Sequence, residues 1–116
     1  MPLTLVMINR TSGCPQSTLA RRILDDLGVD YVEQHYDVDP AVRERLLRWT
    51  GFLSIPTLYV ADGDPAQPIS PPEPITPGTS PRGIDRGSML TEPSTDQLLA
   101  WLRKHGLTRA SEWVLG

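Results

Sequence analysis

The most constraining feature of the sequence is a Cys-Pro pair placed between an apolar run and a helical pattern. Residues 3–8 are apolar and partly β-branched, which is typical of a short buried strand. Cys14 follows a short turn, and Pro15 fits the first position of a helix, where its missing N–H costs nothing. A helix N-terminus stabilises a thiolate, so Cys14 is a candidate nucleophile.

Cys14 is also the only cysteine among the 116 residues. An internal disulfide is therefore impossible, and any redox chemistry must take its second sulfur from another molecule. A lone cysteine is commonly buried and inert, but Ser12 and Gly13 place this one on a turn, which favours a reactive thiol. Arg10, four residues upstream, is expected to add positive charge.

Hydrophobic spacing and helix-end signals divide the chain into alternating strands and helices. Asp39 is expected to cap one helix, and Ser94 with Gln97 forms a capping box for another. The expected strands cover residues 3–8, 29–36, 57–60 and 88–91, and the helices, caps included, lie within 15–28, 39–51 and 94–106. The expected inner faces are Leu19, Ile23, Leu24 and Leu27; Val42, Leu46, Leu47 and Trp49; and Leu98, Leu99, Trp101 and Leu102.

This order predicts an α/β fold with a four-stranded mixed sheet flanked by three helices. The right-handed crossover makes the first two strands parallel neighbours. The last two strands are joined by a loop and are expected to pair antiparallel. We expect one domain over residues 1–116, with a C-terminal tail at 107–116.

Seven prolines lie between Pro65 and Pro81, and they interrupt the regular pattern. Proline neither continues a helix nor donates to a strand ladder, so residues 62–87 are expected to form a long loop of polyproline character. A passive loop is the favoured interpretation, and a recognition element for an aromatic groove is the alternative. The loop residues Arg82, Asp85 and Arg86 are expected to be solvated charges.

The composition argues against several classes of partner. The net charge is −3, which gives no reason to expect nucleic acid or an acidic membrane surface as a partner. No apolar run approaches the ~20 residues of a membrane helix, and no leader pattern is evident. His35 and His105 lack ligand-like neighbours, so no metal site is expected. We expect a cytoplasmic monomer.

Four motifs, taken in order, resemble the glutaredoxin family of the thioredoxin-like superfamily. Residues 14–17 (Cys-Pro-Gln-Ser) follow the first strand, 36–39 precede the second helix, and 50–56 lead into the third strand. Residues 90–94 look more like those of mycoredoxins. The resemblance implies a thioredoxin-like fold, with Cys14 as the nucleophile.

The same resemblance assigns further roles. Pro56 is expected to be a cis-proline that presents the backbone of Ile55 to the peptide part of a thiol substrate. The supporting residues are expected to be Gly13, Pro15, Ser17 and Arg10, and the substrate-binding residues Thr11, Ile55, Pro56 and Thr91.

The chain also departs from the family pattern. Ser17 replaces the second cysteine of a Cys-x-x-Cys pair; it cannot attack a mixed disulfide, but it can donate a hydrogen bond to the thiolate. Thr11 stands in place of a lysine that contacts glutathione, and Phe52 and Leu53 replace polar or basic contacts. Residues 92–94 (Glu-Pro-Ser) replace a Gly-Gly pair.

The sequence therefore favours a monothiol thiol–disulfide oxidoreductase of cell redox homeostasis. Its substrates would be thiols or mixed-disulfide proteins. It would hold no tightly bound cofactor and would use glutathione or another low-molecular-weight thiol as co-substrate. Two alternatives remain open: a redox-inactive thioredoxin-like binding or regulatory module, and a monothiol glutaredoxin that binds an iron–sulfur cluster.

Overall fold

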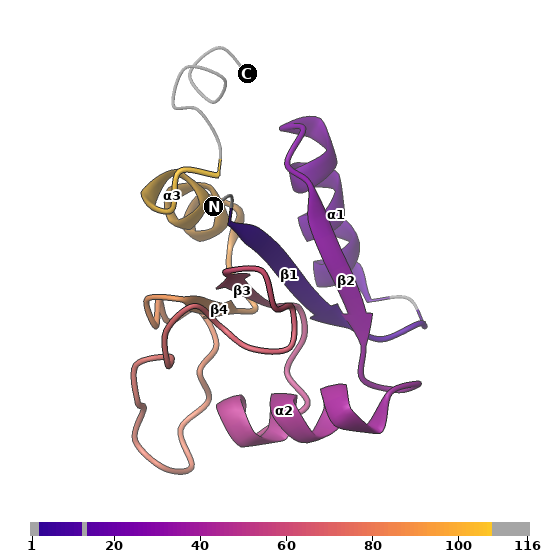
Figure 1. Ribbon diagram of the computed structural model, residues 1–116, viewed down its shortest axis with the longest axis vertical. Helices are drawn as coiled ribbons and strands as arrows, with labels where there is room; N and C mark the ends of the chain where they lie inside the picture. Colours follow the sequence, from indigo (N-terminus) through magenta and orange to yellow (C-terminus); the bar gives the residue numbers. More distant parts are fainter. Residues whose placement is uncertain (1–2, 13, 108–116) are drawn as a thin grey trace.

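The computed structural model describes residues 3–12 and 14–107 and contains a four-stranded sheet with three helices (Figure 1). The sheet order is β2-β1-β3-β4, with β1 and β2 parallel and the other two pairs antiparallel. The expected mixed sheet and its strand directions are thereby confirmed. The elements are β1 (Thr4–Asn9), α1 (Pro15–Asp26), β2 (Tyr31–His35), α2 (Pro40–Thr50), β3 (Thr57–Ala61), β4 (Met89–Thr91) and α3 (Thr95–Lys104).

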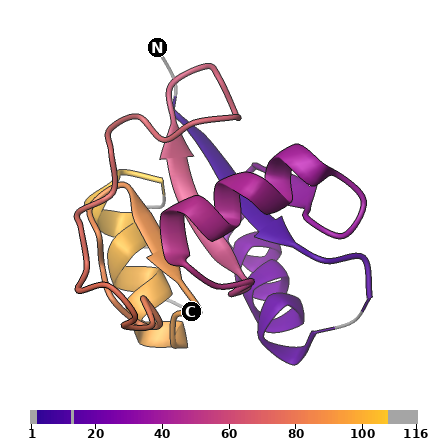
Figure 2. The same cartoon turned by 90° about the horizontal axis from the view of Figure 1, so that it is seen from below.

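The helices cover the two faces of the sheet unequally. Alternating side chains of β1 point to opposite faces, so Leu5 and Met7 join one core while Val6 and Ile8 join the other. The first core packs against α1 and α3, and the second packs against α2 (Figure 2). The result is a three-layer arrangement in which Cys14 contacts the second core.

The helix ends follow the sequence signals closely. The Asp39 carboxylate accepts a hydrogen bond from the Ala41 N–H at 3.0 Å. Ser94 and Gln97 form both halves of the expected capping box. Gly51 closes α2 in the left-handed region at φ 78°, where a side chain would be strained.

Two expected core positions are wrong. Leu19 is 47% exposed and Leu47 is 39% exposed. In α1 the buried stripe instead consists of Ser17, Ala20 and Leu24, whose small first members let the helix approach the sheet. Of the expected tail only Leu107 lies within the described residues, where it packs against the core of α1 and α3.

The proline-rich segment is more ordered than its composition suggests. The sequence predicts that it joins no ladder, yet Arg82 bridges to Thr91 and Asp85 bridges to Leu90 beside β4. The Gly83 N–H also donates to the Thr91 carbonyl at 2.8 Å. The last part of the loop therefore pairs with β4, which is possible because the prolines end at Pro81.

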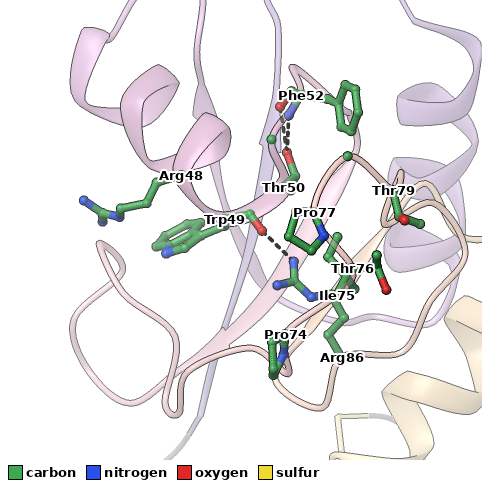
Figure 3. Close-up of a pocket in the computed structure, with 12 residues that line it drawn as sticks. Arg48, Trp49, Thr50, Phe52, Pro74, Ile75, Thr76, Pro77, Thr79 and Arg86 are labelled. Carbon is green, nitrogen blue, oxygen red and sulfur yellow. Dashed lines mark hydrogen bonds between the residues drawn. The ribbon is translucent and has the colours of Figure 1, made fainter.

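The expectation that the charged loop residues are solvated is wrong for Arg86, which is only 5% exposed. Its Nε donates to the Glu73 carbonyl at 2.7 Å. One terminal nitrogen donates to the Trp49 carbonyl, also at 2.7 Å (Figure 3). Arg86 thus joins the loop to the C-terminal end of α2. Burial lowers the pKa of Arg86, but its two carbonyl acceptors satisfy the charged form.

Helix α3 holds the same loop from the other side. The Trp101 indole N–H donates to the Gly87 carbonyl at 3.0 Å, and His105 Nε2 contacts the same oxygen at 2.8 Å. The Gln97 amide donates to the Gly83 carbonyl at 2.9 Å, and Lys104 pairs with Asp85 at 2.6 Å. No helix among the described residues is long and apolar enough to cross a membrane.

Replacing Arg86 with methionine tests this anchoring. Arg86→Met keeps the length of the side chain but leaves the Trp49 and Glu73 carbonyls without their donor. We expect the free energy of unfolding, measured by urea denaturation, to fall by about 2 kcal/mol. The matched control Arg82→Met, at an exposed position, should change it by less than about 0.5 kcal/mol. Equal effects of the two substitutions would contradict the anchoring role.

An ion-pair cluster joins α1 to β2. The Arg21 Nε and one terminal nitrogen donate to the two Glu33 carboxylate oxygens, at 2.9 and 2.7 Å, and His35 Nε2 contacts the carboxylate at 2.9 Å. The hydrogen bonds from Arg21 are the main cause that lowers the pKa of Glu33 to about 2. Protonation of Glu33 therefore costs the folded state more than the unfolded state.

This pKa predicts a component of acid sensitivity. Because the folded-state pKa of Glu33 is depressed, its stabilisation is present above the ordinary carboxyl pKa and is lost as the pH falls towards 2. Glu33→Gln should be less stable than the unmodified protein at pH 7, and the difference should shrink near pH 2. Glu44→Gln, in the exposed Arg48 pair, is the control and should show little pH-dependent difference.

Candidate functional site

Cys14 occupies the N-cap position of α1, directly before Pro15. Its backbone is extended, with φ −138° and ψ 121°, and its carbonyl accepts the first helical hydrogen bond from the Thr18 N–H at 2.9 Å. The thiol is free and partly exposed. The backbone N–H groups of Gln16 and Ser17, in the first helical turn, are therefore close enough to act on the sulfur, as the Cys-Pro pair predicts.

Several donors favour the thiolate of Cys14. Burial raises the pKa of the thiol, but hydrogen bonds from the Ser17 backbone and hydroxyl lower it. The Gln16 backbone and the charge of Arg10 lower it further, and the sum places the pKa below its usual range. The Ser17 hydroxyl is buried and forms no hydrogen bond in the resting geometry of the described residues, so it is available to donate to the sulfur when the thiol ionises.

The loop before β3 forms the opposite side of the site. The peptide bond between Ile55 and Pro56 is cis. Within residues 3–12 and 14–107 the backbone of Ile55 makes no hydrogen bond, whereas the Pro56 carbonyl accepts one from the Glu92 N–H at 2.8 Å. The Ile55 backbone is therefore available for pairing with an extended ligand.

An open depression of about 390 Å³ lies beside the thiol. It brings together the α1 N-terminus, the loop before β3, the proline-rich loop and the end of β4. Its described lining residues are Arg10, Cys14, Gln16, Phe52, Leu53, Ser54, Ile55, Ser80 and Glu92. Of the residues expected at the site, the structure thus gathers Arg10, Cys14 and Ile55 here, and Ser17 lies below the sulfur.

Other expected residues lie elsewhere. The N–H of Thr11 donates to the Asp37 carboxylate at 3.1 Å and its hydroxyl at 2.5 Å, so both polar groups are already engaged. Those bonds lower the pKa of Asp37. Thr91 is fully buried, and its hydroxyl contacts that of Thr57 at 3.0 Å. Neither Thr11 nor Thr91 lines the depression, and Gly13 lies outside the described residues.

Six lining residues were not expected as site residues. Gln16, Phe52, Leu53 and Ser54 belong to the motifs around Cys14 and Pro56, whereas Ser80 and Glu92 lie far from both in the sequence. Ser80 lies far along the proline-rich loop, and no local pattern indicates that this loop folds back to Cys14. Glu92 had a visible signal, because a charged residue stands before Pro93 where the family pattern has glycine. Its backbone is in the left-handed region at φ 45°, which is uncommon for a residue other than glycine.

A second hollow, of about 330 Å³, lies between the end of α2 and residues 74–79 (Figure 3). Phe52 borders both hollows and is 42% exposed. The Thr50 hydroxyl fixes this segment, because it donates to the Phe52 carbonyl at 2.6 Å and accepts from the Phe52 N–H at 3.1 Å. The described residues contain no cluster of three or more His, Cys, Asp or Glu side chains that could hold a metal ion.

Comparison with known families agrees with this geometry. The family model described as Glutaredoxin matches residues 5–64, which include Cys14 and the cis-proline loop. The chain belongs to the glutaredoxin family. Membership confirms the expected thioredoxin-like fold and supports a thiol–disulfide oxidoreductase function in general terms. Searches among curated proteins and among solved structures gave no significant match.

The role of Ser17 in this glutaredoxin-family site can be measured directly. Ser17→Ala removes the hydroxyl donor, so the pKa of Cys14 should rise and the thiolate fraction at pH 7 should fall. We expect the rate of iodoacetamide alkylation at pH 7 to drop about threefold, the effect of losing one modest hydrogen bond. The control Ser12→Ala, at an exposed position in the same turn, should leave the rate unchanged. An unaltered pH profile in Ser17→Ala would argue against the hydrogen bond.

Proposed function

We propose that this glutaredoxin-family protein is a monothiol oxidoreductase that acts on mixed disulfides. The observation that carries the proposal is the placement of a partly exposed thiol, with a lowered pKa, beside the Ile55 backbone, which makes no hydrogen bond within residues 3–12 and 14–107. The thiol supplies the nucleophile, and the backbone supplies a docking edge for the substrate.

The reaction proceeds in two balanced exchanges. The Cys14 thiolate attacks one sulfur of a mixed disulfide, so a new disulfide forms with Cys14 and the other sulfur leaves as a thiolate that takes up a proton. A second thiol, from glutathione or another low-molecular-weight thiol, then attacks this new disulfide and releases Cys14. Ser17 cannot carry out this second step, because its hydroxyl is not a reducing group.

The supporting groups have separate tasks. Gln16, Ser17 and Arg10 favour the charged form of Cys14, which makes it a better leaving group in the second exchange. Pro15 starts the helix that presents the sulfur, and the cis bond at Pro56 orients Ile55. The likeness of residues 90–94 to mycoredoxins supports a bacterial low-molecular-weight thiol as one choice of co-substrate.

The proposal also covers the cellular compartment, the oligomeric state and the partners of the protein. We propose a monomer that works on thiols or mixed-disulfide proteins in a reducing cytoplasm, and the presence of one cysteine, which forms no internal disulfide, fits that compartment. No tightly bound cofactor is needed for either exchange. Nucleic acid and membranes are not proposed as partners, because the chain has no basic surplus.

A thiol-transfer assay tests the proposal. Mixed disulfides of glutathione, mycothiol and bacillithiol would be offered to the unmodified protein and to Cys14→Ser. We expect transfer above the uncatalysed rate with at least one of them, and none above it with the variant, which lacks the nucleophile.

Transfer no faster than Cys14→Ser with all three substrates would refute the oxidoreductase. Combined with an alkylation pKa at or above that of a free cysteine, this result would favour the alternative of a redox-inactive binding module.

A further inference from the structure

Glu92 is an acidic residue at the thiol depression that the proposed reaction does not use. Glu92 lines the depression together with Cys14 and Arg10. Across residues 3–12 and 14–107, the Glu92 side chain makes no hydrogen bond or ion pair. The carboxylates of Asp37 and Asp85, in contrast, bond to Thr11 and Lys104. Glu92 is therefore free to meet a ligand.

The backbone of Glu92 itself is in an unfavourable conformation. Glu92 has φ 45°, although a residue before proline normally takes an extended conformation. Its N–H is fixed by the Pro56 carbonyl at 2.8 Å, so the cis-proline loop sets its position. Glycine would adopt this backbone more easily, and strained residues of this kind gather at functional sites.

The charges in the depression leave a negative balance. Arg10 and Glu92 are the charged side chains among its described lining residues. The thiolate of Cys14 adds a second negative charge, and Arg10 already acts on that thiolate. A ligand in the depression therefore meets one positive and two negative charges.

We propose that Glu92 is a specificity-determining residue that favours mixed disulfides of cationic thiols over those of anionic thiols. The inference rests on the proposed function and narrows its substrate class. An ammonium group carried by the thiol would gain an ion pair with Glu92, whereas a carboxylate would be repelled in a partly desolvated setting. The mixed disulfide of a neutral thiol should be used less well than that of a cationic thiol and better than that of an anionic thiol.

The experiment uses three mixed disulfides that share one uncharged fluorescent thiol. The other half is cysteamine (cationic), 2-mercaptoethanol (neutral) or 3-mercaptopropionate (anionic), and dithiothreitol resolves Cys14. The kcat/KM for each is measured above the Cys14→Ser background. Because the three thiols differ in intrinsic reactivity, the cationic-to-anionic ratio is compared between the unmodified protein and its variants.

Glu92→Gln removes the charge and keeps the shape, so the ratio should fall about fivefold, and the fall should be smaller at high salt. Glu92→Gly should also lose the preference while its midpoint of thermal unfolding stays at or above that of the unmodified protein, because glycine relieves the backbone. Glu73→Gln, the same change at an exposed loop position outside the depression, should leave the ratio unaltered.

The outcomes separate the two proposals. Activity with an unchanged ratio in Glu92→Gln, or an equal fall in Glu73→Gln, would overturn the role of Glu92 and leave the proposed function intact. Absence of transfer with these three substrates alone would overturn the charge selection. Absence of transfer with the glutathione, mycothiol and bacillithiol disulfides as well would overturn the proposed function, and the charge selection with it.

Discussion

The arrangement around the thiol depends on two hydrogen bonds donated by the buried guanidinium of Arg86. It joins the Trp49 carbonyl at the end of α2 to the Glu73 carbonyl in the proline-rich loop. A segment rich in proline offers few N–H groups of its own, so its carbonyls need donors from elsewhere. Arg86 supplies these donors in a fixed planar geometry. The chain between Glu73 and Arg86 is thereby closed against the fold, and Ser80 within it reaches the depression beside Cys14.

The site combines a nucleophile whose thiolate is stabilised with a binding surface that has few polar side chains. Backbone N–H groups and the Ser17 hydroxyl stabilise the sulfur without any second cysteine. The opposite wall offers the backbone of Ile55 and the apolar surface of Phe52 and Leu53. Recognition by backbone and apolar contacts depends little on the identity of the substrate. A single fixed charge such as Glu92 then has a large share in any discrimination among substrates.

The regular elements and the thiol could be predicted from the sequence because their signals are local. Pro15, Asp39 and the Ser94–Gln97 box each act within one helical turn, and the structure has all three where expected. The burial of Arg86 could not be predicted, because it depends on two carbonyls 37 and 13 positions away in the sequence.

The residues of the candidate site also differ in whether local sequence or long-range contacts determine their position. Cys14, Ser17 and Ile55 belong to short motifs that carry their own geometry. Thr11 is engaged by Asp37, 26 positions away, and Ser80 reaches the depression only through the folding of the loop. For Glu92 the residue type before Pro93 is visible in the sequence, but its left-handed backbone and the pairing of its N–H with the Pro56 carbonyl are not. Long-range contacts thus decide what surrounds a thiol whose own position is set locally.

The loop attachments place two indole rings next to the segment they hold. Trp101 donates its ring N–H to Gly87 at one end of the loop. Trp49 lines the hollow beside residues 74–79, in the middle of the loop, and packs edge-on against Tyr59, with ring centroids 5.1 Å apart. Indole emission responds to hydrogen bonding and to solvent contact, so release of the loop at either place would change the intrinsic fluorescence. The protein thus carries its own optical reporters of whether the proline-rich loop is attached beside the thiol.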